Sequence, residues 1–99
     1  MPRNSSECFS ESLRFLLSWY GIQQKDLVGR FAKYSSTVNR WAKGVDVPTW
    51  KTFDQLCVYF DVEPYEMLDV KKLMNRFVAQ NVPRTLPKKK NLAFDKSED

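Results

Sequence analysis

Apolar side chains recur every three or four residues along most of this chain, a spacing that places them on one face of an α-helix. The pattern predicts five helices, over residues 6–20, 24–32, 35–43, 50–60 and 64–81. We expect Ser5 or Ser6 to cap the first helix, and Gly21 and Gly44 to end the first and third. No stretch alternates long enough to indicate a β-strand, so the sequence predicts an all-α fold.

The chain changes character at Pro83, which is expected to end the fifth helix. Residues 82–99 contain a second proline, the run Lys88-Lys89-Lys90 and an acidic end. Such a segment has little apolar surface to bury. The sequence therefore predicts one domain over residues 6–81 and a basic, disordered tail over residues 82–99.

The composition excludes several kinds of site. The 99 residues include no histidine, so neither a histidine-assisted nucleophile nor a histidine metal ligand is available. Cys8 and Cys57 are expected to be free thiols, and the three scattered glycines form no phosphate-binding loop. We therefore expect no enzymatic activity, no metal and no cofactor. The N-terminus lacks the apolar core of a signal peptide and no apolar run could span a membrane, so we expect a cytoplasmic protein.

The stretch AKYSSTVNRWAKG, residues 32–44, is unusual for a surface helix. Val38 and Trp41 are spaced to point inward, but the other side carries only short hydrogen-bonding side chains and cations. Surface helices usually mix acidic and basic residues, because pairs on neighbouring turns stabilise them. A helix without acid suits the DNA major groove, where phosphates line both sides and Ser, Thr, Asn and Arg can hydrogen-bond base edges. The net charge of +4 also weakly favours an anionic partner such as DNA.

A short connection at Lys33 and Tyr34 joins the second and third predicted helices, as in a helix-turn-helix. Residues 13–68 resemble, without a gap, the five-helix domain of the phage-repressor and Cro-like (Xre) helix-turn-helix family. The matching features are GIQQKDL, STVNRW, the Gly44 stop, Pro48 in the following loop and FDQLCVYFDVEPYEML. The resemblance implies a lambda-repressor-like fold and binding to duplex DNA.

The resemblance also implies a role for each matching position. Gln24, the first residue of the second predicted helix, would bond a backbone phosphate. The base contacts would come from Tyr34, Ser35, Ser36, Asn39 and Arg40, and the backbone contacts from Gln24, Lys33, Thr37, Lys43, Thr49 and Trp50. Because phosphate contacts set the register and base contacts specify the sequence, the two sets should respond differently to mutation.

The sequence departs from the family pattern around the turn. Ala32 replaces the usual glycine, Lys33 an apolar residue, and Tyr34 the usual Ser or Thr cap. A cap at Ser35 instead would slide the recognition residues by about one position. Purely structural roles, as caps or as charges near a helix C-terminus, stay open for Ser35, Ser36, Arg40 and Lys43.

The first predicted helix carries a second apolar face beside its inner stripe. Phe15 and Trp19 lie one turn apart on it, where the resembling family usually has polar residues, and exposed patches of this kind mark contacts. The apolar face of the fifth predicted helix could cover this patch, either by folding back within its own chain or by meeting it in a second subunit. The candidate dimer or partner face comprises Phe15, Trp19, Val70, Leu73, Met74 and Phe77.

These features predict a sequence-specific duplex-DNA-binding regulator of transcription, acting as a homodimer on a palindromic operator. We expect a repressor of a phage, plasmid or bacterial operon, located in the cytoplasm with the nucleoid. The alternative is a protein-interaction module on the same fold, such as an antitoxin or a partner-neutralising protein. Affinity for mixed DNA across a salt series distinguishes the two, because only DNA binding falls steeply with salt.

Overall fold

The computed structural model describes residues 4–86 of the 99-residue chain. Within that part the chain forms five α-helices and one short 3-10 helix, with no β-strand. They are α1 (Ser5–Tyr20), η1 (Gln24–Leu27), α2 (Ser35–Lys43), α3 (Trp50–Phe60), α4 (Pro64–Met67) and α5 (Val70–Ala79). The predicted all-α class is confirmed, and none of the described helices has the length and apolar character that a membrane span needs.

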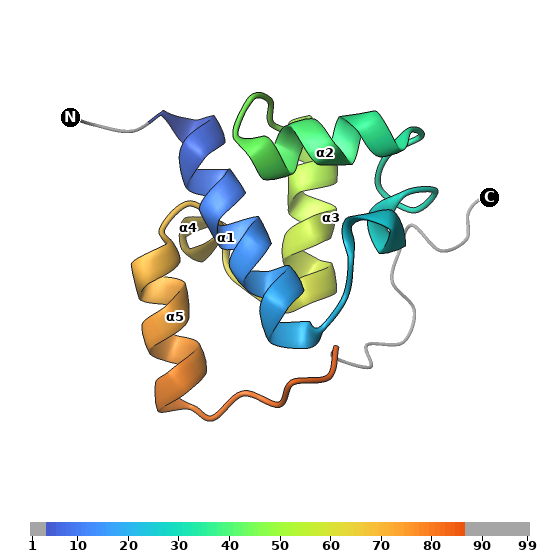
Figure 1. Ribbon diagram of the computed structural model, residues 1–99. Helices are drawn as coiled ribbons and strands as arrows, with labels where there is room; N and C mark the ends of the chain where they lie inside the picture. Colours follow the sequence, from blue (N-terminus) through green and yellow to red (C-terminus); the bar gives the residue numbers. More distant parts are fainter. Residues whose placement is uncertain (1–3, 87–99) are drawn as a thin grey trace.

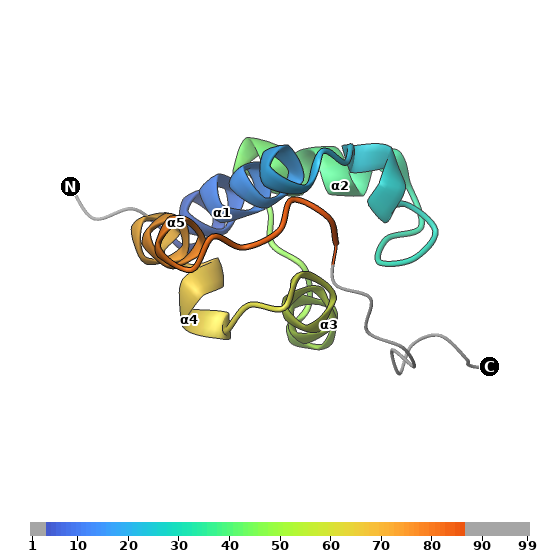
Figure 2. The same cartoon turned by 90° about the horizontal axis from the view of Figure 1, so that it is seen from below.

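α1 runs through the domain between α2 and α5, which flank it on opposite sides (Figure 1). Seen from below, α1 and α2 lie on one side of the domain and α3 and α4 on the other (Figure 2). The core fills the space between these layers. Phe9, Leu13 and Leu16 of α1 are fully buried in it. The Phe9 ring meets Trp41 of α2 at 6.3 Å and Phe53 of α3 at 5.9 Å between centroids, so one side chain joins three helices.

Two predicted helices, over residues 35–43 and 50–60, have the bounds that the sequence predicted. The first helix begins at Ser5, and its cap is Asn4 rather than Ser5 or Ser6. Asn4 Oδ1 accepts hydrogen bonds from Glu7 N at 2.9 Å and from Ser6 Oγ at 2.7 Å. The serine prediction was wrong because asparagine, one residue upstream, is at least as good an N-cap.

The second predicted helix, over residues 24–32, was wrong beyond Leu27. η1 is a single 3-10 turn, after which Val28 is extended and Gly29 adopts a φ of 89°. Gly29 N donates to Ala32 O at 2.7 Å and closes a tight turn. Glycine reaches this left-handed conformation at little cost, so the chain can leave the helix there. The turn still delivers Phe31 to the core, which explains why its apolar spacing looked helical.

The fifth predicted helix, over residues 64–81, is two helices that meet at Leu68 and Asp69. Asp69 caps α5, because its Oδ1 accepts from Lys72 N at 3.3 Å. A short carboxylate that bonds nearby backbone competes with helix continuation. The break gives α4 and α5 separate axes, so Met67 and Leu73 both reach full burial.

A buried ion pair holds α4 and α5 together. Glu66 is almost fully buried, and both of its carboxylate oxygens accept from the Arg76 guanidinium, with 3.0 Å between Nη2 and Oε1. Arg76 Nη2 also donates to Asp61 O at 3.1 Å, which ties α5 to the end of α3. The hydrogen bond to Glu66 raises the pKa of Arg76, so the guanidinium stays charged. Removing Arg76 would leave the buried Glu66 carboxylate without compensation.

α5 packs on α1 of its own chain. The Phe77 ring lies 5.6 Å from Phe15, 5.4 Å from Trp19 and 6.0 Å from Tyr20 between centroids, and Leu73 is fully buried. Of the two alternatives for this face, the structure therefore has the fold-back. The assignment of Leu73, Phe77, Phe15 and Trp19 to a subunit contact was wrong, because these side chains already pack against one another. Val70, Met74 and Val78 remain on the outer side of α5, half-buried or exposed.

The domain continues past residue 81, where the sequence placed its end. Asn81 reverses the chain with a φ of 51°, and the next residues run back between α1 and α3 (Figure 2). Trp19 Nε1 donates to Pro83 O at 3.3 Å, and the Arg84 guanidinium carbon lies 3.7 Å from the centroid of the Trp19 ring. Leu86 packs against the core. Residues 82–86 are thus part of the fold, and the Lys88-Lys89-Lys90 run lies outside the described residues.

Candidate nucleic-acid interface

α2 begins after Tyr34, which occupies the N-cap position with extended backbone and no capping side-chain bond. The expected shift of the cap to Ser35 is therefore wrong, and Ser35 and Ser36 are the first two residues of the helix. Within residues 4–86 neither serine hydroxyl makes a hydrogen bond, and both side chains are exposed. A capping role therefore does not account for these two exposed hydroxyls.

The inner side of α2 packs against the core of the domain. Val38 is fully buried, and Trp41 and Ala42 are nearly so. Ser10 Oγ of α1 donates to Ala42 O at 2.6 Å. Gly44 ends the helix with a φ of 79°, and a Cβ built there would lie 3.5 Å from Ser10 Cβ. α2 is thus held at its C-terminal end by both packing and a buried hydrogen bond.

The outer side of α2 carries no acid. Its exposed side chains are Ser35, Ser36, Arg40 and Lys43, while Thr37 and Asn39 are half-buried. Just before the helix, Lys33 is exposed and Tyr34 keeps 62% of its surface accessible. All of the predicted base-contacting residues therefore lie on or beside one surface.

A hydrogen bond joins two residues that the sequence assigned to different roles. Asn39 Nδ2 donates to Gln24 Oε1 at 3.3 Å, so the first residue of η1 contacts the middle of α2. The bond uses one of the two Asn39 N–H groups and leaves Oδ1 and the other N–H available. Gln24 therefore fixes how Asn39 presents its amide. Sequence spacing could not show this contact, because a turn of unpredicted shape separates the two residues.

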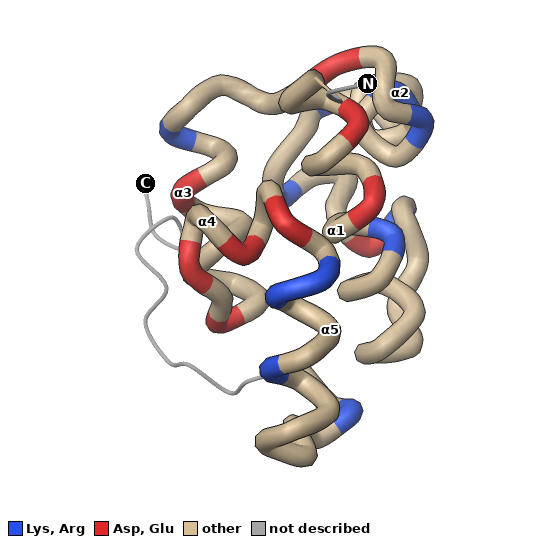
Figure 3. Tube along the Cα trace, turned by 90° about the vertical axis from the view of Figure 1, so that its left-hand side faces the viewer, with Lys and Arg blue, Asp and Glu red and all other residues tan. Residues whose placement is uncertain are grey.

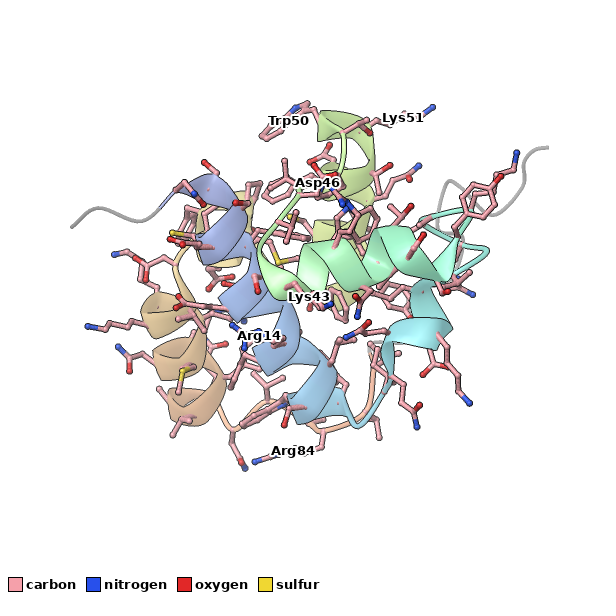
Figure 4. The ribbon with its side chains drawn as sticks, turned by 45° about the horizontal axis from the view of Figure 1, so that its top comes forward. Arg14, Lys43, Asp46, Trp50, Lys51 and Arg84 are labelled. Carbon is pink, nitrogen blue, oxygen red and sulfur yellow. The ribbon has the colours of Figure 1, made fainter. Side chains whose placement is uncertain are left out.

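Arg40 is paired with a residue that the sequence analysis missed. Its Nε donates to Asp46 Oδ2 at 3.3 Å, and the two side chains are 54% and 53% exposed. Asp46 lies in the loop that joins α2 to α3, where Figure 4 labels it. The signal in the sequence was weak: a single acid follows the glycine stop of a helix that otherwise shows only cations and hydrogen-bonding groups.

The start of α3 forms one edge of this surface. Thr49 Oγ1 caps α3 by accepting from Thr52 N at 3.4 Å. Trp50 is 70% exposed although its ring stacks on Phe53, with 5.2 Å between centroids. Lys51 projects from the opposite side of the same helix end, and Lys43 lies near Arg14 of α1 in the same view (Figure 4). Cations from three helices thus lie around the exposed side of α2.

Charge is distributed unevenly over the domain. The segment of residues 21–45 contains one acid, Asp26, and the cations Lys25, Arg30, Lys33, Arg40 and Lys43. The segment of residues 54–69 contains no lysine or arginine and the acids Asp54, Asp61, Glu63, Glu66 and Asp69. Figure 3 shows acidic positions gathered around α4. An anionic partner is therefore attracted to the side of η1 and α2 and repelled from α4.

The described residues offer little for other chemistry. They contain no group of three or more Cys, Asp or Glu side chains that could hold a metal ion. Burial raises the pKa of the Cys57 thiol to about 12, which makes that cysteine a poor nucleophile. The sequence matches no protein-family model, and comparison with curated proteins and with solved structures likewise finds no match.

Proposed function

We propose that this protein binds duplex DNA sequence-specifically by placing α2 in the major groove, and that it acts as a transcriptional repressor by occupying its site. The observation that carries the proposal is the outer side of α2. It presents hydroxyl, amide and guanidinium groups without any acid, on a helix whose opposite side is buried. These groups match what base edges in the major groove accept and donate.

The charge distribution supports the same orientation. Phosphates flank a helix that lies in the groove, and Lys33, Lys43 and Lys51 lie around α2 where such phosphates would be. The acids around α4 would face away from the duplex. Binding through this surface would combine long-range attraction with contacts that read the bases.

The proposed fold relationship is a modified lambda-repressor-like domain of the Xre type. In this reading η1 and the turn at Gly29 take the place of the first helix of the helix-turn-helix, and α2 is the recognition helix. Gln24 at the start of η1 keeps the position that the resemblance assigns to a phosphate contact. The bond from Asn39 to Gln24 then links phosphate binding to base reading.

We also propose a homodimer, through the outer side of α5 rather than through its buried face. Val70, Met74 and Val78 follow one another at intervals of four residues, and Met74 and Val78 are 43% and 67% exposed. Apolar side chains at this spacing form a stripe along a helix. Two copies joined in this way could present two copies of α2 to a palindromic site.

A second candidate function is a protein-interaction module. Its supporting observation is that exposed apolar side chains flank α2, namely Tyr34, Val45, Val47 and Trp50. Such residues occur at interfaces with proteins, where aromatic anchors contribute much of the affinity.

The test begins with selection of bound fragments from random DNA, followed by binding to the selected site across a salt series. A dimer that makes six to ten phosphate contacts should lose about 10³–10⁵ in affinity between 50 and 200 mM salt. Arg40→Ala should cost about 1–3 kcal/mol at the selected site and relax the preference at one base pair. Lys72→Ala, at an exposed position of α5 that helical spacing places away from Val70, Met74 and Val78, is the matched control and should change neither. Absence of salt-dependent binding would exclude the DNA proposal and favour the protein-interaction module.

A further inference from the structure

The loop between α2 and α3 places a carboxylate beside the arginine that the proposed function assigns to base reading. Asp46 Oδ2 accepts from Arg40 Nε at 3.3 Å. This contact uses the inner edge of the guanidinium and leaves the N–H groups of Nη1 and Nη2 available. An arginine that reads guanine needs two parallel N–H groups directed at O6 and N7. The paired edge is therefore the one that such a contact does not require.

Asp46 is itself held in place. Its Oδ1 accepts from Val47 N at 3.1 Å, so the carboxylate is bound to its own loop. The loop starts at a fixed point, because Val45 N donates to Arg40 O at 3.0 Å and Gly44 packs on α1. It ends at Thr49, which caps α3. Asp46 therefore offers the long and flexible Arg40 side chain a hydrogen-bond acceptor in a defined position.

We propose that Asp46 is a specificity-determining residue that orients Arg40 for a two-point contact with a single guanine. The inference rests on the proposed DNA-binding function. Free arginine side chains carry much rotamer entropy, and a preformed orientation reduces what is lost when the contact forms. An acid at the edge of a phosphate-facing surface also repels the duplex. Asp46 therefore lowers affinity for every sequence and raises discrimination at one base pair, a combination typical of specificity determinants.

Two other roles for Asp46 make different predictions. If the carboxylate only shielded Arg40 from DNA, its removal would release the arginine, and affinity and discrimination would rise together. If it acted only as a repulsive charge, neutralising it would raise affinity and leave discrimination unchanged. A carboxylate that both orients Arg40 and repels the phosphates predicts instead that removing it raises affinity for mixed DNA and lowers discrimination.

The experiment compares Asp46→Asn and Asp46→Ala with the wild type on the selected site, on its single-base variants and on mixed DNA. The asparagine amide oxygen can still accept from Val47 N, but its NH₂ group then faces Arg40 and offers no acceptor, whereas alanine removes both contacts. Discrimination at one G·C pair should fall by about twofold to fivefold in both variants, the range that an exposed ion pair supplies, because both remove the acceptor for Arg40. Both variants should bind mixed DNA more tightly. Asp54→Asn, which removes an exposed acid of α3, should not alter discrimination.

An Arg40→Ala background completes the test. There, Asp46→Ala should have no further effect on discrimination, because the side chain that it orients is absent. Discrimination that is kept or increased in Asp46→Ala, with a folded protein and selective wild-type binding, would overturn the inference and leave the proposed function standing. A wild type that shows no selective binding would instead overturn the proposed function itself. If Asp46→Ala is unfolded, Asp46→Asn alone decides, since it preserves the loop bond.

Discussion

Gln24 and Asn39 should act as a coupled pair in DNA recognition. The resemblance implies that Gln24→Ala weakens binding to all sequences alike, because a phosphate carries no base identity. The bond from Asn39 Nδ2 to Gln24 Oε1 changes that expectation. Without Gln24, Asn39 loses the contact that orients its amide, so Gln24→Ala should also relax the preference at the base pair that Asn39 reads.

The size of this coupling follows from the bond. A neutral hydrogen bond contributes about 0.5–1.5 kcal/mol net. The separation of 3.3 Å is longer than the usual N–H···O distance, and Asn39 is only half-buried, so the lower part of that range applies. We expect a coupling of about 0.5–1 kcal/mol, or about twofold to fivefold in affinity, at the selected site.

A double-mutant cycle measures it. Wild type, Gln24→Ala, Asn39→Ala and the double variant are titrated on the selected site and on its single-base variants. Gln55→Ala on α3 serves as the control partner and should be additive with Asn39→Ala. Additivity of Gln24→Ala and Asn39→Ala within about 0.3 kcal/mol would refute the coupling, since distant and independent sites behave that way. If Gln24→Ala lowered affinity equally for all of these DNA sequences, Gln24 would contact only the DNA backbone.

Three further predictions concern the stability and the assembly of the domain. Phe77→Ala should lower the free energy of unfolding, measured in urea, by about 3–5 kcal/mol, as for a buried aromatic ring. A Phe77→Ala variant that dissociates without losing stability would instead place this face of α5 in a subunit contact. Met74→Glu should leave the chain folded and shift its sedimentation to that of a monomer. The folded-state pKa of Cys57, about 12, lies above its usual 9.0, so its stabilising contribution is complete below about pH 9 and is lost as pH rises toward 12. Cys57→Ala should flatten that part of the curve of unfolding free energy against pH, and an unchanged slope would argue against the buried thiol.

Much of the helical framework could be predicted from the sequence because its signals are local. The bounds of α2 and α3 follow from apolar spacing, from Gly44 as a helix stop and from Thr49 as a cap, all within a few residues. The absence of acid on α2 is likewise visible in the sequence. The errors arose where a competing local signal was overlooked. Gly29 ended a segment with helical spacing, and Asp69 started a new helix inside an apparently continuous one.

Other features depended on the tertiary structure. Apolar spacing showed that α5 has an apolar face, but not whether Phe77 would meet Trp19 of its own chain or another copy, because the same side chains serve either contact. The bond from Asn39 to Gln24 and the pair of Arg40 with Asp46 each cross a turn whose path no periodicity encodes. The sequence by itself determined which groups α2 presents. The turns on either side of α2 decided which neighbours hold those groups, because a hydrogen bond of about 3 Å requires a backbone path that only the packed domain defines.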